Sequence, residues 1–300
     1  MFVYDDGSDP TKTASLATQS IESDHVVAMT NGAETPTLDI PYSQVADRYG
    51  IPYISGSPWE PWWGAGPWKY AWNDMFHIAE PTSNCPESWT LAAQYSGVTE
   101  QFEKQTNMVA GIVASDDSDG AAWYPLYLPI LQKLGFDVVQ PTKNFGLYPP
   151  GTTDFSSIIE VFKSESVEVI WALAPPPDWG IFMRQSKEYN FRPKMIFASK
   201  AANIYEGIAS WGDGLPYGVM ADNWWIITGP WQGFNGRTPA DLNSAWESYS
   251  GTPRNFAVGG GYAAIQILVA AAEQGGTHDP GAMKKPAPNL EASPSTQPTP

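Results

Sequence analysis

The sequence predicts an α/β protein with two lobes, each a parallel sheet flanked by helices. Strand-like apolar runs begin near residues 26, 51, 108, 136, 167, 194 and 217. Most successive runs start ~25–30 residues apart, which is close to the length of a strand–helix unit. The runs MVAGIVA, VEVIWAL and KMIFA are apolar throughout, as expected for strands covered on both faces. The intervening segments have helical periodicity, which favours alternating strands and helices.

The chain is organised around residues 24–63, which we interpret as strand, loop, helix, strand and loop. His25–Met29 and Ile51–Ser55 are the predicted strands, and an apolar stripe at helical spacing lies between them. Parallel strands joined by a helix leave their loops at one edge of the sheet, where ligands of open α/β folds gather. The candidate ligand contacts in these loops are Asn31, Gly32, Ser55, Ser57 and Trp59.

Helices are also expected over 123–134, with a kink at Pro129, and over 256–274. Asp154 is the expected N-cap of a helix with an apolar stripe over 155–162. Residues 1–4 are expected to be the end of a strand that leads into a turn and a helix. Asp5, Asp6 and Asp9 fit turn and cap positions better than ligand contacts.

Composition excludes several classes of protein. The formal net charge of −16 argues against binding to nucleic acid or to anionic membranes. The single cysteine, Cys85, excludes an internal disulfide and the usual zinc spacings. No stretch approaches ~20 apolar residues, and the start of the sequence lacks the pattern of a signal peptide. The 14 tryptophans fit either a Trp-rich core or stacking on a ligand.

No motif for catalysis, a cofactor or a metal is present. Asp116, Asp117 and Asp119 lack the register and the distal Glu of a calcium loop. The three histidines are far apart in the sequence, and there is no nucleophile elbow or glycine-rich phosphate loop. We therefore expect no enzyme activity, no cofactor and no metal.

The order of several short motifs is similar to that of the leucine/isoleucine/valine-type solute-binding proteins of ABC transporters. These motifs are Tyr4-Asp5-Asp6-Gly7, Asp9-Pro10, Pro36, Asp39-Ile40, Gly50-Ile51-Pro52, Ile54-Ser55, Asp154-Phe155 and Met183-Arg184-Gln185. The resemblance covers residues 1–275 and implies the type I periplasmic binding fold. It also implies a fragment truncated at both ends, because such proteins usually have a further strand and helix upstream and more strands downstream.

The resemblance implies two lobes that close on hinges around a solute. Residues 1–81 and 222–275 are expected to form the first lobe, and residues 82–221 the second. The Pro-rich segment 276–300 is expected to be a disordered tail. The implied partners are a small solute and permease subunits. Binding to nucleic acid and insertion into a membrane are not expected. The implied location is the periplasm or the extracellular space.

In the second lobe the resemblance implies contacts from Ser118, Asp119, Asp178, Trp179 and Lys200. Relatives that bind α-amino acids commonly place an acidic residue near Lys200 to hold the ammonium group. We therefore expect a small polar or aromatic solute, or one with a carboxylate, rather than a branched-chain amino acid. Lys200 in a merely solvated role and Trp59 as a core residue are the alternatives.

Two other functions fit parts of the sequence. A ligand-sensing regulator or receptor domain would use the same fold, although nothing here resembles a DNA-binding segment. A glycosidase-type hydrolase would need two carboxylates about 5–9.5 Å apart, for which Asp119 and Asp178 are the candidates.

Overall fold

The computed structural model describes residues 1–32, 34–57, 59–74, 103–140, 147–212, 214, 218–221, 225–234, 236–276 and 278–283. The chain divides into two units, Met1–His77 with Trp224–Pro300 and Ile78–Asn223. They are named unit 1 and unit 2 in this order. The lobe limits expected from the sequence, at 81 and 222, fall on residues outside the described part of the chain, so they stay predictions.

Unit 1 contains a parallel three-stranded sheet in the order β1-β2-β3. Its strands are β1 (Met29–Thr30), β2 (Tyr53–Ser55) and β3 (Ala71–Asn73). Met29 lies opposite Tyr53, and Ser55 lies opposite Asn73. Because all pairs are parallel, the loops after the three strands leave from one edge of the sheet.

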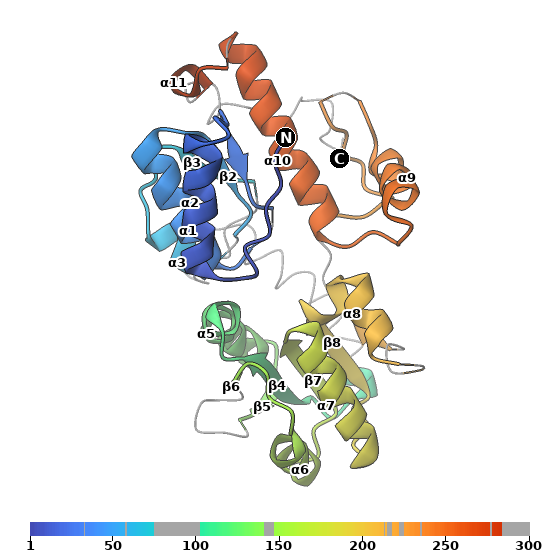
Figure 1. Ribbon diagram of the computed structural model, residues 1–300. Helices are drawn as coiled ribbons and strands as arrows, with labels where there is room; N and C mark the ends of the chain where they lie inside the picture. The colour runs from blue at the N-terminus through green and yellow to red at the C-terminus, as the bar shows by residue number, and fades with distance from the viewer. Residues whose placement is uncertain are drawn as a thin grey trace. The chain divides into compact units, whose positions relative to one another are not determined.

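Helices cover both faces of this sheet (Figure 1). On one face, α1 (Pro10–Glu22) and α2 (Pro36–Tyr49) pack through Ala17, Val45 and Ala46 against Met29 and Tyr53. On the other face, α10 (Ala257–Gly275) packs against Ile54 through Ala264 and Leu268. The remaining helices of unit 1 are α3 (Glu60–Gly64), α9 (Pro239–Ser250) and α11 (Pro280–Met283).

Unit 2 is built on a larger parallel sheet in the order β5-β4-β7-β8-β9, with β6 paired to β4. Its strands are β4 (Val109–Ser115), β5 (Asp137–Val139), β6 (Leu147–Tyr148), β7 (Val169–Leu173), β8 (Met195–Ser199) and β9 (Val219–Met220). The helices among its described residues are α5 (Ser118–Lys133), α6 (Ser156–Ser164), α7 (Pro176–Glu188), α8 (Tyr205–Ser210) and the 3₁₀ turn η1 (Ala201–Asn203).

The core of unit 2 lies between the sheet and α6 and α7. Phe155, Phe162 and Phe182 are fully buried there against side chains of β4, β7 and β8. The opposite face carries Trp171, whose ring contacts Phe136 and Phe197 at centroid distances of 5.8 and 5.0 Å. Apolar groups on both faces explain why these strands have no polar alternation in the sequence.

The fold class expected from the sequence is confirmed: both units are parallel sheets flanked by helices. Several details differ. Only Met29–Thr30 is a strand in the first predicted run, and His25 has a left-handed backbone conformation with φ 53°. Residues 1–4 are not a strand, and the short strands β3 and β6 were not predicted. A three-residue or two-residue strand leaves too little periodicity to detect.

The two aspartates that the sequence places at helix starts, Asp9 and Asp154, both accept hydrogen bonds from the first turn of a helix. Asp9 caps α1 by accepting from the backbone N–H groups of Thr11 and Lys12. Asp154 accepts from the backbone N–H of Ser156 at 2.9 Å, although the N-cap of α6 is Phe155.

The end of unit 1 also differs from expectation. Pro280–Met283, in the predicted tail, form α11, and Met283 is buried. The rest of that tail, 284–300, lies outside the described residues. Among the helices that are described, none is both long and apolar enough to cross a bilayer.

The close approach of α6 to β4 can be tested at Gly111. A Cβ atom there would lie 2.6 Å from the ring of the fully buried Phe162. We expect Gly111→Ala to lower the free energy of unfolding of unit 2 by about 1–3 kcal/mol, because a packed core resists added volume. Urea denaturation measures this change. In the control Gly261→Ala, the added atom meets nothing within 4 Å, so stability should be unchanged or rise slightly.

Candidate functional site

The polar candidates of unit 2 lie at the carboxyl ends of its parallel strands. Ser115 is the last residue of β4, and Asp119 is in the first turn of the following α5. Asp178 is in the first turn of α7, which follows β7. Lys200 directly follows β8. Three segments that are far apart in the sequence therefore place polar side chains along one edge of one sheet.

The start of α5 is fixed against the end of β4. Asp117 caps the helix by accepting from the backbone N–H groups of Asp119 and Gly120 at 3.0 and 2.9 Å. Gly120 lies so close to β4 that a Cβ atom would be 1.8 Å from the carbonyl oxygen of Ser115. Only glycine allows this approach, which holds the two aspartates at the strand end.

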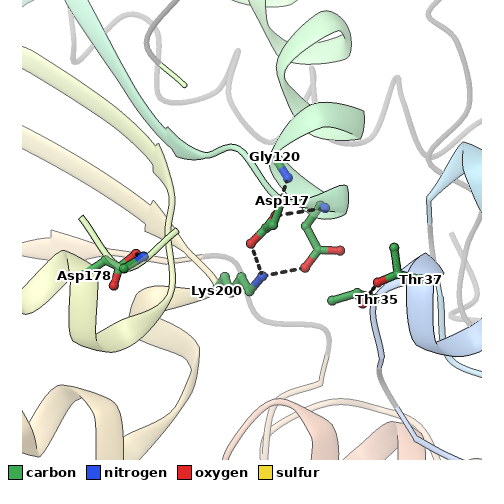
Figure 2. A network of polar contacts seen from close by, with 8 residues as sticks. Thr35, Thr37, Asp117, Gly120, Asp178 and Lys200 are labelled. Carbon is green, nitrogen blue, oxygen red and sulfur yellow. Dashed lines mark hydrogen bonds and ion pairs between the residues drawn. The ribbon is translucent and has the colours of Figure 1, made fainter. Parts of the chain in front are cut away.

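Lys200 is paired with both of these aspartates (Figure 2). Its Nζ lies 2.7 Å from Asp119 Oδ2 and 3.2 Å from Asp117 Oδ2. Burial acts to lower the pKa of Lys200, but the two carboxylates outweigh it and raise this pKa above its ordinary value. The lysine is therefore charged, and its charge is already neutralised by residues of the same unit.

The backbone of Lys200 is in a conformation that favours glycine, with φ 62° and ψ −54°. A non-glycine residue in such a region costs about 1–3 kcal/mol and persists only where its surroundings hold it. Strain of this kind is commonly found at functional sites. Here it directs the side chain toward the first turn of α5, as Figure 2 shows.

A second polar cluster contains Ser115, Tyr148 and Asp178. Burial raises the pKa of Tyr148 well above its ordinary value, and the nearby carboxylate of Asp178 raises it further. Asp178 accepts from the backbone N–H of Gly151 at 3.3 Å. The side-chain oxygens of Ser115 and Tyr148 are buried. The Tyr148 hydroxyl interacts with both Ser115 and Asp178, but no contact of either oxygen has ordinary hydrogen-bond geometry. Buried polar groups with poor hydrogen bonds are costly, so a ligand that supplied better ones would be favoured here.

The two tryptophans predicted to line the site are core residues. Trp179 is fully buried and stacks on Phe182 at a centroid distance of 4.9 Å. Trp59 has only 7% of its surface exposed. Ser118 is half-buried at the start of α5, beside the aspartate that pairs with Lys200.

In unit 1 the predicted loop residues form one hydrogen-bonded group. Ser55 Oγ accepts from the backbone N–H of Ser57 and from Asn73 Nδ2, both at 3.1 Å. Asn31 Nδ2 and Ser55 Oγ both donate to Asp39, which α2 places beneath them. Gly32 has φ 73°, and a Cβ atom there would meet nothing within 4 Å.

Sequence reasoning missed several members of these groups: Asp39, Tyr53 and Asn73 in unit 1, and Ser115, Asp117 and Tyr148 in unit 2. A signal for Asp39 exists, because it lies three and seven positions before Tyr42 and Ala46 of the apolar stripe and so shares the buried side of the helix. Asn73 and Tyr148 end short strands that the sequence did not reveal.

The charges in unit 2 indicate what the edge can bind. Asp117 and Asp119 both form an ion pair with Lys200, whereas Asp178 makes no ion pair with any described residue. The four groups together are anionic. They suit hydrogen-bond donors or a cation better than a free carboxylate. No group of three or more potential metal ligands is found within the described residues.

Comparison with known proteins identifies the family. A family profile described as periplasmic binding protein matches residues 1–294. The chain belongs to the periplasmic binding protein family. The match identifies a binding protein rather than an enzyme.

Solved structures share this fold at low sequence identity. A leucine-binding protein from Thermotoga maritima has a TM-score of 0.73 at 16% identity, over 94% of this chain and 74% of that one. An extracellular ligand-binding receptor from Rhodopseudomonas palustris HaA2 has a TM-score of 0.72 at 14% identity, over 97% and 78%. A solute-binding protein from Rhodopseudomonas palustris BisB5, in complex with 3,4-dihydroxybenzoic acid, has a TM-score of 0.66 at 16% identity, over 94% and 72%.

The pairing and the strain at Lys200 can be separated by two substitutions. Lys200→Ala should lower the free energy of unfolding by about 2 kcal/mol, because it leaves two largely buried carboxylates without their cation. Lys200→Gly also removes the cation but relieves the backbone strain, so it should cost about 1 kcal/mol less. Chemical denaturation of both variants measures the difference.

Lys194 provides a matched control. It pairs with Glu168 at 2.8 Å, but its side chain is 54% exposed, so Lys194→Ala should cost under ~1 kcal/mol. A glycine variant at position 200 that is no more stable than the alanine variant would contradict the role of strain.

Proposed function

We propose that this chain is the extracytoplasmic solute-binding component of an ABC transporter, acting in the periplasm or outside the cell. It captures a small polar solute that presents hydrogen-bond donors and passes it unaltered to permease subunits. Family membership supports the transport role. The observation that carries the solute class is the pair of buried oxygens of Ser115 and Tyr148, which make no hydrogen bond of ordinary geometry and lie beside the carboxylate of Asp178.

The state of Lys200 supports this choice of solute. A lysine at a strand end would normally favour an anionic ligand, but this one already has two carboxylate partners. An incoming carboxylate would have to compete with Asp117 and Asp119 in a buried setting, where a displaced charge is expensive. A solute with an ammonium or hydroxyl group needs no such exchange.

The surroundings also disfavour a branched-chain amino acid. Related structures are described as binding leucine, isoleucine or 3,4-dihydroxybenzoic acid. In this chain the candidate strand-end side chains of unit 2 are polar, and the nearby Trp179 is part of the core. An aliphatic side chain would find little apolar surface at these positions, whereas hydroxyl and amino groups would find acceptors.

The solute class can be tested with purified, dialysed protein. Melting temperature and Trp fluorescence are measured with diamines, hydroxyl amino acids, polyols, leucine and 3,4-dihydroxybenzoate. We expect saturable responses to solutes rich in donors and no turnover of any of them. Responses to leucine or to 3,4-dihydroxybenzoate alone would overturn the proposed class, and no response to any solute of this broad panel would count against the binding role.

These two buried oxygens give a prediction that separates binding from stability. Ser115→Ala and Tyr148→Phe should each weaken solute affinity about five- to tenfold, by removing one hydrogen bond to the solute. The same changes should leave the free energy of unfolding unchanged or raise it by about 1 kcal/mol, because they remove unsatisfied buried groups. Calorimetric titration and urea denaturation measure the two quantities.

Ser164→Ala is the control for loss of a hydroxyl. Ser164 is at the end of α6, and its Oγ donates to the carbonyl oxygen of Val161 at 2.9 Å. This variant should bind solute normally. A loss of stability without loss of affinity at positions 115 and 148 would show that these groups serve folding alone.

A further inference from the structure

Asp39 is a buried carboxylate beneath the strand-end loops of unit 1. It lies in the first turn of α2 and has no exposed surface. Its Oδ1 accepts from Asn31 Nδ2 at 3.0 Å and also from the hydroxyl of Tyr53. Its Oδ2 accepts from Ser55 Oγ at 2.8 Å. A buried carboxylate that accepts from three side chains is a strong constraint on the groups that surround it.

The constraint extends from Asp39 to the ends of all three strands. Because Ser55 Oγ donates its hydrogen to Asp39, it can only accept from the backbone of Ser57 and from Asn73 Nδ2. Asn73 Nδ2 also donates to the carbonyl oxygen of Ser57 at 2.7 Å. Asn31 follows β1, Ser55 ends β2 and Asn73 ends β3. One carboxylate thus anchors the loops that carry the predicted ligand contacts.

The same arrangement decides which way the amide of Asn31 faces. An ionised carboxylate only accepts hydrogen bonds, so the NH₂ group of Asn31 must be the end that points to Asp39. The carbonyl end, Oδ1, is then directed away from Asp39. This oxygen is buried and has no hydrogen-bond partner, and the same is true of Ser57 Oγ. Unit 1 therefore holds two polar atoms ready for a ligand.

We propose that Asp39 is a positioning residue that fixes Asn31 as a hydrogen-bond acceptor, so that unit 1 recognises a donor group of the solute. This inference rests on the proposed function and deepens it. Ser57 Oγ, which can donate or accept, adds a second contact without changing this preference. The solute class is that of ammonium, amide N–H or hydroxyl groups. It is the same class that the strand ends of unit 2 favour by their own charges.

The protonation of Asp39 would reverse this orientation. Burial raises the pKa of Asp39 to about 6, although its hydrogen-bond donors act to lower it. Its titratable neighbours are acids or phenols: Asp74, with a pKa raised to about 7 by burial, Tyr42 and Tyr53. The negative charges of Asp6 and Glu34, in the adjacent loops, raise the pKa of Tyr42. The charge of Glu34 also raises the pKa of Tyr53.

Once protonated, Asp39 is itself a donor on one oxygen, and the carbonyl end of Asn31 can turn to accept from it. The acceptor offered to the solute is then lost. Affinity for a donor-bearing solute should therefore fall as the pH falls through about 6, and recover above it.

The orientation of Asn31 can be tested without any solute. The side-chain amide of Asn31 and the backbone amide of Ser57 are followed by NMR between pH 4.5 and 8. In the unmodified chain both signals should shift with a common midpoint within about one unit of pH 6. In Asp39→Asn, which keeps the shape but cannot ionise, this titration should disappear. An unchanged titration in the variant, or none in the unmodified chain, would overturn the proposal.

Two further variants provide a control and a second test of the titration. Asp47→Asn is the matched control, because Asp47 is in the same helix and accepts from the backbone N–H groups of Lys69 and Tyr70, before β3 begins. It should leave the Asn31 titration unchanged. Tyr53→Phe removes one donor from Asp39 and should move the midpoint upward. It keeps the proposal testable if Asp39→Asn does not fold.

The solute arm uses 1,4-diaminobutane and L-serine as probes. Asp39→Asn should weaken the binding of a donor-bearing probe about tenfold at pH 7.5 and abolish its pH dependence. Equal affinity and equal pH dependence in the variant would overturn the role of Asp39 in recognition. If neither probe binds the unmodified chain, the proposed solute class fails for these probes, while the NMR result still decides whether Asp39 positions Asn31.

Discussion

Every candidate binding group of this protein depends on parallel strand pairing. In unit 2, β4 pairs with β7 and β7 with β8 over five residues each, and Leu173 lies opposite Ser199. Parallel pairing brings the carboxyl ends of these strands to one edge, so the residues that follow them are neighbours regardless of their separation in the sequence. The apolar layers on both faces of the sheet hold that edge in place.

The two units use a buried carboxylate in opposite ways. In unit 2, Asp117 and Asp119 serve to neutralise a cation, so Lys200 becomes a structural tie between β8 and α5. In unit 1, Asp39 accepts from the hydroxyl and amide groups of described residues rather than from a cation, and it orders the loop residues around it. In both cases the charged groups lie among the candidate ligand contacts and limit what these can accept or donate.

Much of the architecture could be predicted, because apolar runs at a regular spacing identify buried parallel strands. The site could be predicted only as a set of loops. Asn31, Ser55 and Ser57 do form one hydrogen-bonded group, whereas Trp179 is a core residue, and the sequence does not distinguish an indole in a core from one in a cleft. The pairing of Lys200 with Asp119 joins residues 81 positions apart, which no local pattern encodes.

The neutralised lysine also has a kinetic consequence. With 32 acidic and 16 basic side chains, the chain has an overall negative field, and Lys200 adds no local positive region to its strand edge. Such a field reaches about 8 Å at physiological ionic strength. It accelerates the arrival of cations and slows that of anions before any contact forms. Discrimination between solutes thus begins during diffusion, and dilute salt strengthens it.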